Sequence, residues 1–217
     1  MKSVKHNILI VNPNSNQEVT DRTQQTANRI LGPHSKALVI HPTDSPFSIE
    51  TFADRLVAEP LAIDLLSLHQ GYDAYVMACF DDIAIKAARR FLNVPVVDSV
   101  EASIAIARLY GSRFAIVTTV ETMVPGIKTL IENLGVTDQC SVRAAGIGVA
   151  SAAAGDLEAL ERLDETITTA RNVDGAKVII LGSGGLTGQA KRLTVKHGIP
   201  VIDCIEAAIK FSEMASK

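Results

Sequence analysis

Two segments of the sequence carry side chains that could move a proton. Cys79 directly follows the apolar run Tyr75-Val76-Met77-Ala78, and Ser183 lies in the glycine-rich segment Gly182-Ser183-Gly184-Gly185. A thiol at a strand end, below the amino end of the next helix, is expected to have a lowered pKa, because backbone N–H groups and the helix dipole stabilise the thiolate. The glycines leave N–H groups free to hold an anion. Cys79 is therefore the first candidate for acid or base chemistry, and Ser183 the second.

The segment around Ser183 does not match the common phosphate or hydrolase motifs. A Walker loop needs a Lys followed by Ser or Thr, whereas Lys191 is followed by Arg192, and the GxGxxG pattern is absent. A strand followed by Gly-Ser-Gly is compatible with a nucleophile elbow, which needs a histidine base from elsewhere. None of the five histidines stands in a recognisable triad context. Serine hydrolysis is therefore the weaker alternative.

Polar side chains follow the first apolar run and its counterpart in the second half. Asn12 and Asn14 come after residues 8–11, and Thr118 and Thr119 hold the matching place. A helix cap explains one residue of the first cluster, most easily Ser15 or Asn16, but not the whole cluster. We expect the amide and hydroxyl groups to frame a ligand site.

Other titratable residues are interpreted as structural. Asp81 and Asp82 are expected to begin a helix, where carboxylates interact favourably with the dipole. Asp98 with Glu101, and Asp203 with Glu206, have the spacing of helix capping boxes. The cysteines number three and show no CxxC spacing, which predicts neither a disulfide framework nor a metal site. For an arbitrary cysteine the commoner role is a small buried hydrophobe, and Cys140 and Cys204 keep that interpretation.

Composition narrows the classes of function. The chain has 217 residues, of which 47% are hydrophobic and 4% aromatic, and its formal charge is −3. This balance disfavours nucleic-acid binding, which needs basic excess and stacking aromatics. Apolar runs are too short for a membrane span or a signal-peptide core. We expect a cytoplasmic protein that binds a small molecule and neither nucleic acid nor membrane.

Short β-branched runs alternate with amphipathic stretches, which is typical of βαβ units on a mainly parallel sheet. The expected strands are residues 8–11, 37–41, 74–78, 94–97, 114–118, 141–145, 178–181 and 201–203. The expected helices cover about 16–31, 50–70, 82–92, 100–109, 122–134, 155–172, 187–197 and 204–215. The fold class is therefore α/β.

The chain also repeats itself. Three blocks match in the same order: Ile8–Asn12 with Phe114–Thr118, Met77–Cys79 with Leu181–Ser183, and Val94–Ala102 with Ile199–Ala207. The repeat predicts two pseudo-symmetric Rossmann/flavodoxin-like lobes, residues 1–97 plus 206–217 and residues 98–205. Ligands bind outside the carboxyl ends of such strands, so we expect an active site in a cleft between the lobes, with Cys79 and Ser183 on opposite sides.

On these residues the sequence resembles the aspartate/glutamate/hydantoin racemase superfamily, most closely its hydantoin and allantoin racemase branch. The resemblance covers nearly the whole chain, and its Cys-Phe-Asp-Asp form is closer to allantoin racemases. Its carriers are Val11–Ser15, Ala78–Asp82, Val117–Thr119, Ser141–Ala144 and Leu181–Gly188. The resemblance implies racemisation of a 5-substituted hydantoin, allantoin first, by two opposed cysteines without cofactor or metal. It also implies a homo-oligomer.

Position 183 departs from the family pattern. A serine hydroxyl is too weak an acid to serve as the second base at neutral pH. Either serine replaces cysteine in an active-site variant, or the natural protein has lost one base. The resemblance further implies that backbone N–H groups of Phe80, Gly184 and Gly185 stabilise an enolate. Asn14 and Thr118 would hold the ring, with Asn12 and Thr119 beside them.

Two alternatives stay open, one within the same superfamily and one from a different class of protein. A one-cysteine decarboxylase or isomerase of the same superfamily would protonate an enolate from one face only. A cytoplasmic two-lobed protein that binds a small molecule without catalysis would show neither proton exchange nor racemisation.

Overall fold

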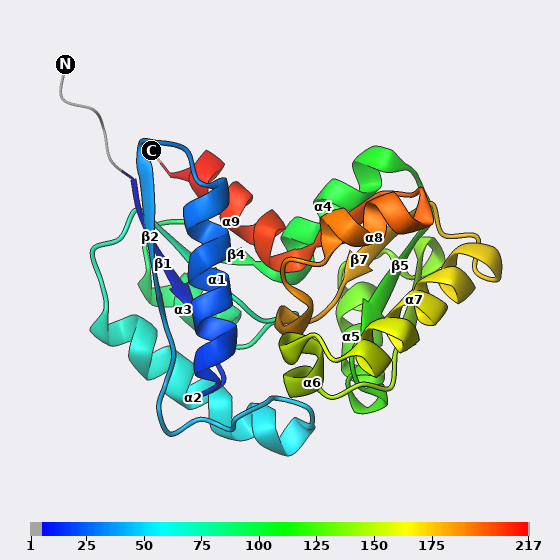
Figure 1. Cartoon of the computed structure of the whole chain (residues 1–217). Helices are drawn as coiled ribbons and strands as arrows, with labels where there is room; N and C mark the ends of the chain where they lie inside the picture. The colour runs from blue at the N-terminus through cyan, green and yellow to red at the C-terminus, as the bar shows by residue number, and fades with distance from the viewer. Residues whose placement is uncertain (1–5, 217) are drawn as a thin grey trace. The chain divides into compact units, whose positions relative to one another are not determined.

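Two four-stranded parallel sheets form the framework of the protein (Figure 1). The structure is a computed structural model and describes residues 6–216. The first sheet has the order β2-β1-β3-β4, and the second has the order β6-β5-β7-β8. Their bounds are β1 His6–Val11, β2 Ser35–Ile40, β3 Ala74–Met77, β4 Val96–Asp98, β5 Phe114–Thr118, β6 Cys140–Ala144, β7 Val178–Leu181 and β8 Val201–Asp203. The predicted α/β fold class with parallel sheets is confirmed.

Helices follow the strands in alternation. The α-helices are α1 Gln17–Ile30, α2 Phe52–Leu68, α3 Ile85–Phe91, α4 Ser99–Tyr110, α5 Val124–Asn133, α6 Val149–Ala154, α7 Leu157–Asn172, α8 Ala190–His197 and α9 Cys204–Ala215. Short 3₁₀ turns are η1 Glu121–Met123, η2 Thr137–Gln139 and η3 Gly184–Leu186. Within the described residues, no helix is both long enough and apolar enough to cross a membrane.

The chain divides into two compact units, each containing one sheet. Unit 1 comprises the described residues up to Ser99 and from Ile205 onward, and unit 2 comprises Val100–Cys204. The lobes predicted from the repeat have boundaries at residues 97/98 and 205/206. In the structure, α4 therefore belongs almost wholly to unit 2, and α9 belongs to unit 1.

Equivalent hydrogen bonds occur at equivalent places in the two units. The N–H of Ala78 donates to the carbonyl of Val11 at 2.8 Å, and that of Gly182 donates to Val117 at 2.9 Å. Tyr75 N–H to Pro95 (2.9 Å) and Ile179 N–H to Pro200 (3.0 Å) form a second matched pair. Cys79 and Ser183 each come one residue after the first matched N–H. The two residues therefore hold the same place on two copies of one backbone frame.

The positions of Cys79 and Ser183 lie where the strand order of each sheet reverses. In each unit, the first strand in the sequence lies inside the sheet, with its second strand on one side and its third on the other. Such a switch point leaves a crevice at the carboxyl ends of the strands, where open α/β sheets bind ligands. Asn12 and Cys79 follow β1 and β3, and Thr119 and Ser183 follow β5 and β7.

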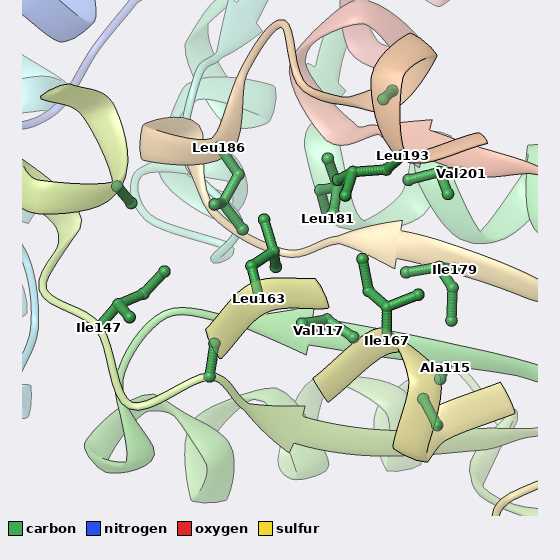
Figure 2. Packing of buried hydrophobic residues seen from close by; sticks show 14 of the residues in the cluster. Ala115, Val117, Ile147, Leu163, Ile167, Ile179, Leu181, Leu186, Leu193 and Val201 are labelled. Carbon is green, nitrogen blue, oxygen red and sulfur yellow. The ribbon is translucent and has the colours of Figure 1, made fainter. Parts of the chain in front are cut away.

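Each unit has an apolar core between its sheet and two helices. In unit 1, α2 and α3 pack on β1 and β3, with Leu66 and Tyr75 fully buried. In unit 2, α7 and α8 contribute Leu163, Ile167 and Leu193 against β5 and β7 (Figure 2). Strands buried on both faces explain the continuous apolar runs in the sequence. The equivalent helices therefore support the equivalent strand ends.

Two differences from the predicted helices bear on the site: one helix begins later, and one helix was not predicted. Helix α3 begins at Ile85 rather than residue 82, so the segment after Cys79 is a longer loop. Helix α6, Val149–Ala154, was not predicted. It lies between Gly148 and Gly155, and Gly155 adopts a left-handed conformation (φ 74°) that ends the helix.

Candidate functional site

The loop after β1 is held together by hydrogen bonds among its own asparagines. The Asn12 side-chain amide donates to Asn14 Oδ1 (2.9 Å) and Thr20 Oγ1 (3.0 Å), and its Oδ1 accepts from the Asn14 N–H (3.3 Å). Asn16 caps α1, as expected for this cluster. Asn12 therefore shapes the loop, whereas the Nδ2 of the buried Asn14 makes no hydrogen bond to another described residue. Of the two predicted ligand residues, Asn14 has the available donor.

Cys79 lies beside this loop, because β1 and β3 are neighbours with Val11 opposite Met77. Its side chain is partly exposed, packs against the core of unit 1, and is followed by the buried Phe80. Burial raises the pKa of the Cys79 thiol, and the Asp81 and Asp98 carboxylates raise it further. Arg55 and the Phe80 backbone N–H lower it by less than the other groups raise it. The lowered pKa predicted for Cys79 is therefore wrong, because burial of the thiol and the charges of Asp81 and Asp98 raise its pKa, and α3 begins only six residues later.

Asp81 and Asp82 do not begin a helix. Arg55 of α2 binds both, through its NH1 to Asp81 Oδ1 and through its NH2 to Asp82 Oδ1 at 2.7 Å. Asp82 also pairs with Lys86 at 3.2 Å, and its N–H donates to Asp81 Oδ1 at 2.8 Å. The interpretation of these residues as dipole-stabilising is corrected to an ion-paired loop. Arg55 was not predicted from the sequence, where its only signal is that it is a basic residue in the first turn of α2.

The Ser183 loop is held by hydrogen bonds from its own backbone N–H groups. Ser183 Oγ accepts a hydrogen bond from the Gly185 N–H at 3.3 Å and caps η3. The Ser183 and Gly184 carbonyls accept from Leu186 and Thr187, which closes a tight turn. Of the two glycines among the three predicted anion donors, Gly185 donates its N–H to Ser183, and the Gly184 N–H makes no hydrogen bond to another described residue. A charged oxygen or sulfur at position 183 would be stabilised by the Gly185 N–H.

Close packing holds this turn in place. Leu186 is buried among Leu163, Leu181 and Ile147 (Figure 2). A Cβ at Gly185 would lie 2.7 Å from the Val149 carbonyl oxygen of α6. Glycine is therefore required at residue 185 by the approach of a second backbone.

Thr118 is the last residue of β5, Thr119 follows it beside this turn, and both are buried. The Thr118 hydroxyl donates to the Gly182 carbonyl at 3.0 Å, which ties β5 to the residue before Ser183. The Thr119 carbonyl accepts from the Ile147 N–H at 3.0 Å. The predicted residues of unit 2 are thus together at one sheet edge, and those of unit 1 at another.

Asp203 has a contact that the capping-box hypothesis does not include. It is buried, and its Oδ2 accepts from the Gly188 N–H at 2.6 Å, at the end of the glycine-rich segment. Asp98, its repeat counterpart, acts electrostatically on Cys79. Each aspartate therefore acts on the strand-end loop of its own unit.

Two surface pockets lie away from these residues. One of about 470 Å³ is lined by Asn7, Lys36 and Tyr72, at the amino ends of the unit 1 strands. The other, of about 340 Å³, lies along β6 and is lined by Glu121, Arg143 and Glu165. Neither includes a predicted site residue, and the first lies at the end of the sheet opposite to Cys79.

The fold and the paired strand-end loops define a class of protein with known members. The model of the Asp/Glu/Hydantoin racemase family matches residues 8–211. The chain therefore belongs to this family, and it is an isomerase of the racemase class.

Individual relatives are similar over nearly the whole chain. A hydantoin racemase from Rhizobium meliloti is 35% identical over 209 residues, which are 95% of this chain and 87% of the relative. An allantoin racemase structure from Klebsiella pneumoniae has a TM-score of 0.92 at 29% identity, covering 98% of this chain and 91% of that one. That of Pseudomonas fluorescens has a TM-score of 0.91 at 29% identity, covering 96% and 89%. These likenesses support the hydantoin and allantoin branch of the family.

Proposed function

We propose that the protein racemises 5-substituted hydantoins, with allantoin the first substrate to test, by removing and returning the proton at C5. The observation that carries the proposal is the equivalent placement of Cys79 and Ser183. Each comes one residue after a matched backbone hydrogen bond, at the switch point of its own sheet. Relatives named hydantoin racemase and allantoin racemase support the choice of substrate class.

The chemistry needs no electron sink beyond the substrate. The C5 hydrogen of a hydantoin is adjacent to a carbonyl, so its removal leaves an enolate with the charge on oxygen. In the proposed step, the Cys79 thiolate takes this proton and becomes a thiol, while the C5–H electron pair moves toward the carbonyl oxygen. Each backbone N–H donor can stabilise such a negative charge by about 3 kcal/mol. The Gly184 N–H and the Asn14 amide are the proposed donors.

Delivery to the opposite face is the weak step. A serine hydroxyl donates or accepts a proton poorly at neutral pH, whereas a thiol has a reference pKa of about 8.5. We therefore expect exchange at C5 of one enantiomer to be faster than racemisation. The raised pKa of Cys79 leaves little thiolate at pH 7. Both rates should increase with pH as the thiolate fraction increases.

Proton exchange tests this proposal. Each pure allantoin enantiomer is incubated in heavy water with the protein, and C5 is followed by NMR while optical rotation is recorded in parallel. Cys79→Ser should abolish the enzymatic exchange, and Cys140→Ser, the same change at the other partly exposed cysteine, should leave it unchanged. Buffer without protein gives the spontaneous rate. Exchange no faster than in buffer for both enantiomers, with tight ligand binding, would instead indicate a binding protein.

A further inference from the structure

Arg55 joins helix α2 to the loop that follows Cys79. Its guanidinium binds Asp81 Oδ1 through NH1 and Asp82 Oδ1 through NH2, the latter at 2.7 Å. The Arg55 side chain is 23% exposed and that of Asp81 only 8% exposed, so this ion pair is largely withdrawn from solvent. Paired contacts from one planar guanidinium fix the orientation of both carboxylates.

A second contact from the same helix holds the end of the loop. Glu59 lies one turn after Arg55, 3.8 Å from it, and its Oε1 accepts from the Ala84 N–H at 3.1 Å. Ala84 has φ 60°, a left-handed conformation that costs a residue with a Cβ about 1 kcal/mol or more. The Glu59 contact stabilises that conformation. Helix α2 therefore fixes the loop at Asp81, Asp82 and Ala84, directly after the thiol.

The same contacts determine the charge next to the thiol. The charged groups that act on Cys79 are the Asp81 and Asp98 carboxylates and the Arg55 guanidinium. Arg55 and Asp81 act in opposite directions, and Arg55 also holds Asp81 in place. Glu59, Asp82 and Lys86 are further charged groups of the same ion-pair network.

We propose that Arg55 is the positioning residue of the Cys79 site, and that it holds the Asp81–Asp82 loop against α2 and balances the carboxylate charge beside the thiol. The role in catalysis rests on the proposed function, but the effect on the thiol does not. Arg55 touches neither the thiol nor, in this proposal, the substrate. It acts through Asp81 and the backbone of the loop.

The alkylation rate of Cys79 measures this role without any substrate. The wild type and the variants Arg55→Gln, Asp81→Asn and the double variant are treated with iodoacetamide at fixed pH values from 7 to 9.5. Modification of Cys79 is followed by mass spectrometry. Arg55→Gln removes the favourable cation, so it should raise the Cys79 pKa and slow alkylation about threefold to tenfold, as expected for a shift of about one pKa unit. Asp81→Asn should accelerate alkylation by a similar factor.

The double variant provides the sharper comparison. Removing Arg55 together with Asp81, the most buried of its partners, avoids leaving that carboxylate without its cation, and Asp82 keeps its ion pair with Lys86, so this variant should fold even where Arg55→Gln does not. Its alkylation rate should lie close to that of the wild type. Arg55→Lys keeps the charge but cannot bind both carboxylates in one plane, and it should restore part of the rate lost in Arg55→Gln.

A matched control comes from unit 2, where Arg143 binds Asp174 through two contacts of 2.7 and 2.6 Å. Arg143→Gln should leave Cys79 alkylation unchanged. Equal rates in wild type, Arg55→Gln and Asp81→Asn, all folded, would overturn the proposed role of Arg55. Altered rates in a protein that shows no C5 exchange would instead retain the role and contradict the proposed racemisation.

Discussion

The loops that follow β3 and β7 begin alike and then diverge. Both start with an N–H that donates to a carbonyl of the neighbouring strand, β1 or β5, and the next residue is Cys79 or Ser183. The first loop continues through Phe80 into a buried ion pair with Arg55. The second continues through glycines into a 3₁₀ turn whose N–H group faces Ser183. The same backbone arrangement therefore places a thiol near carboxylates in unit 1 and a hydroxyl near a backbone N–H donor in unit 2.

This difference indicates that two copies of one backbone arrangement can give different acid–base properties to the side chains at equivalent strand ends. Burial and the nearby carboxylates favour the protonated thiol at Cys79, so the thiolate that takes the C5 proton in the proposed step is the minor form at neutral pH. Backbone N–H groups favour an anion at position 183, which suits a proton acceptor if the side chain is a thiol. The equivalent helices α2 and α7 also differ in what their arginines contact. Arg55 of α2 reaches the unit 1 loop, whereas Arg162 and Arg171 of α7 bind the Gly146 and His197 carbonyls.

The largest expected effect comes from restoring a thiol in unit 2. Ser183→Cys should increase the racemisation rate on the order of 10²–10⁴-fold, the usual contribution of one general acid–base group. Polarimetry on each pure enantiomer measures it. Cys79→Ser in the same background should return the rate to that of buffer, because the two groups act as a unit. An unchanged rate after Ser183→Cys, with ligand affinity retained, would exclude position 183 as the second acid or base.

The next effect concerns the close packing of η3 against α6 in unit 2. Gly185→Ala places a Cβ 2.7 Å from the Val149 carbonyl oxygen, so η3 and α6 must move apart. We expect a loss of about 1–3 kcal/mol in the free energy of unfolding, typical of overpacking. Gly126→Ala in α5 is the control, because nothing lies within 4 Å of its Cβ and alanine favours a helix. A Gly185→Ala variant as stable in thermal unfolding as Gly126→Ala would contradict the packing described.

Most of the fold is predictable because its signals are local. Each of the eight predicted strands overlaps one of the eight strands in the described residues. Helix α6 was missed although alanines favour a helix and Gly155 marks its end. Its six residues are too few for a periodic pattern, and packing against η3 stabilises it.

For the candidate site, the strand-end positions of its residues were predictable from the sequence, but the charges that act on Cys79 were not. The strand ends located Cys79, Ser183 and Asn14, because carboxyl ends of parallel strands share one sheet edge. The pKa of Cys79 depends on Arg55, 24 residues earlier, and on Asp98, 19 residues later. Contacts at such separations follow from the tertiary arrangement of α2 and β4. The hydrogen-bond partner that each amide chooses, as in Asn12 against Asn14, is equally a property of the folded loop.

The smallest expected effect distinguishes the matched positions Asn12 and Thr118, which follow the same repeat register. The Thr118 hydroxyl makes one hydrogen bond, to the Gly182 carbonyl, whereas Asn12 makes several within its loop. Thr118→Val keeps the shape and removes that donor, so it should lower the free energy of unfolding by about 1 kcal/mol. Thr118→Ser retains the hydroxyl and should lose less, and Asn12→Ala should lose more. Urea unfolding followed by circular dichroism measures all three, and a Thr118→Val loss equal to that of Asn12→Ala would show that the two strand ends depend equally on these side chains.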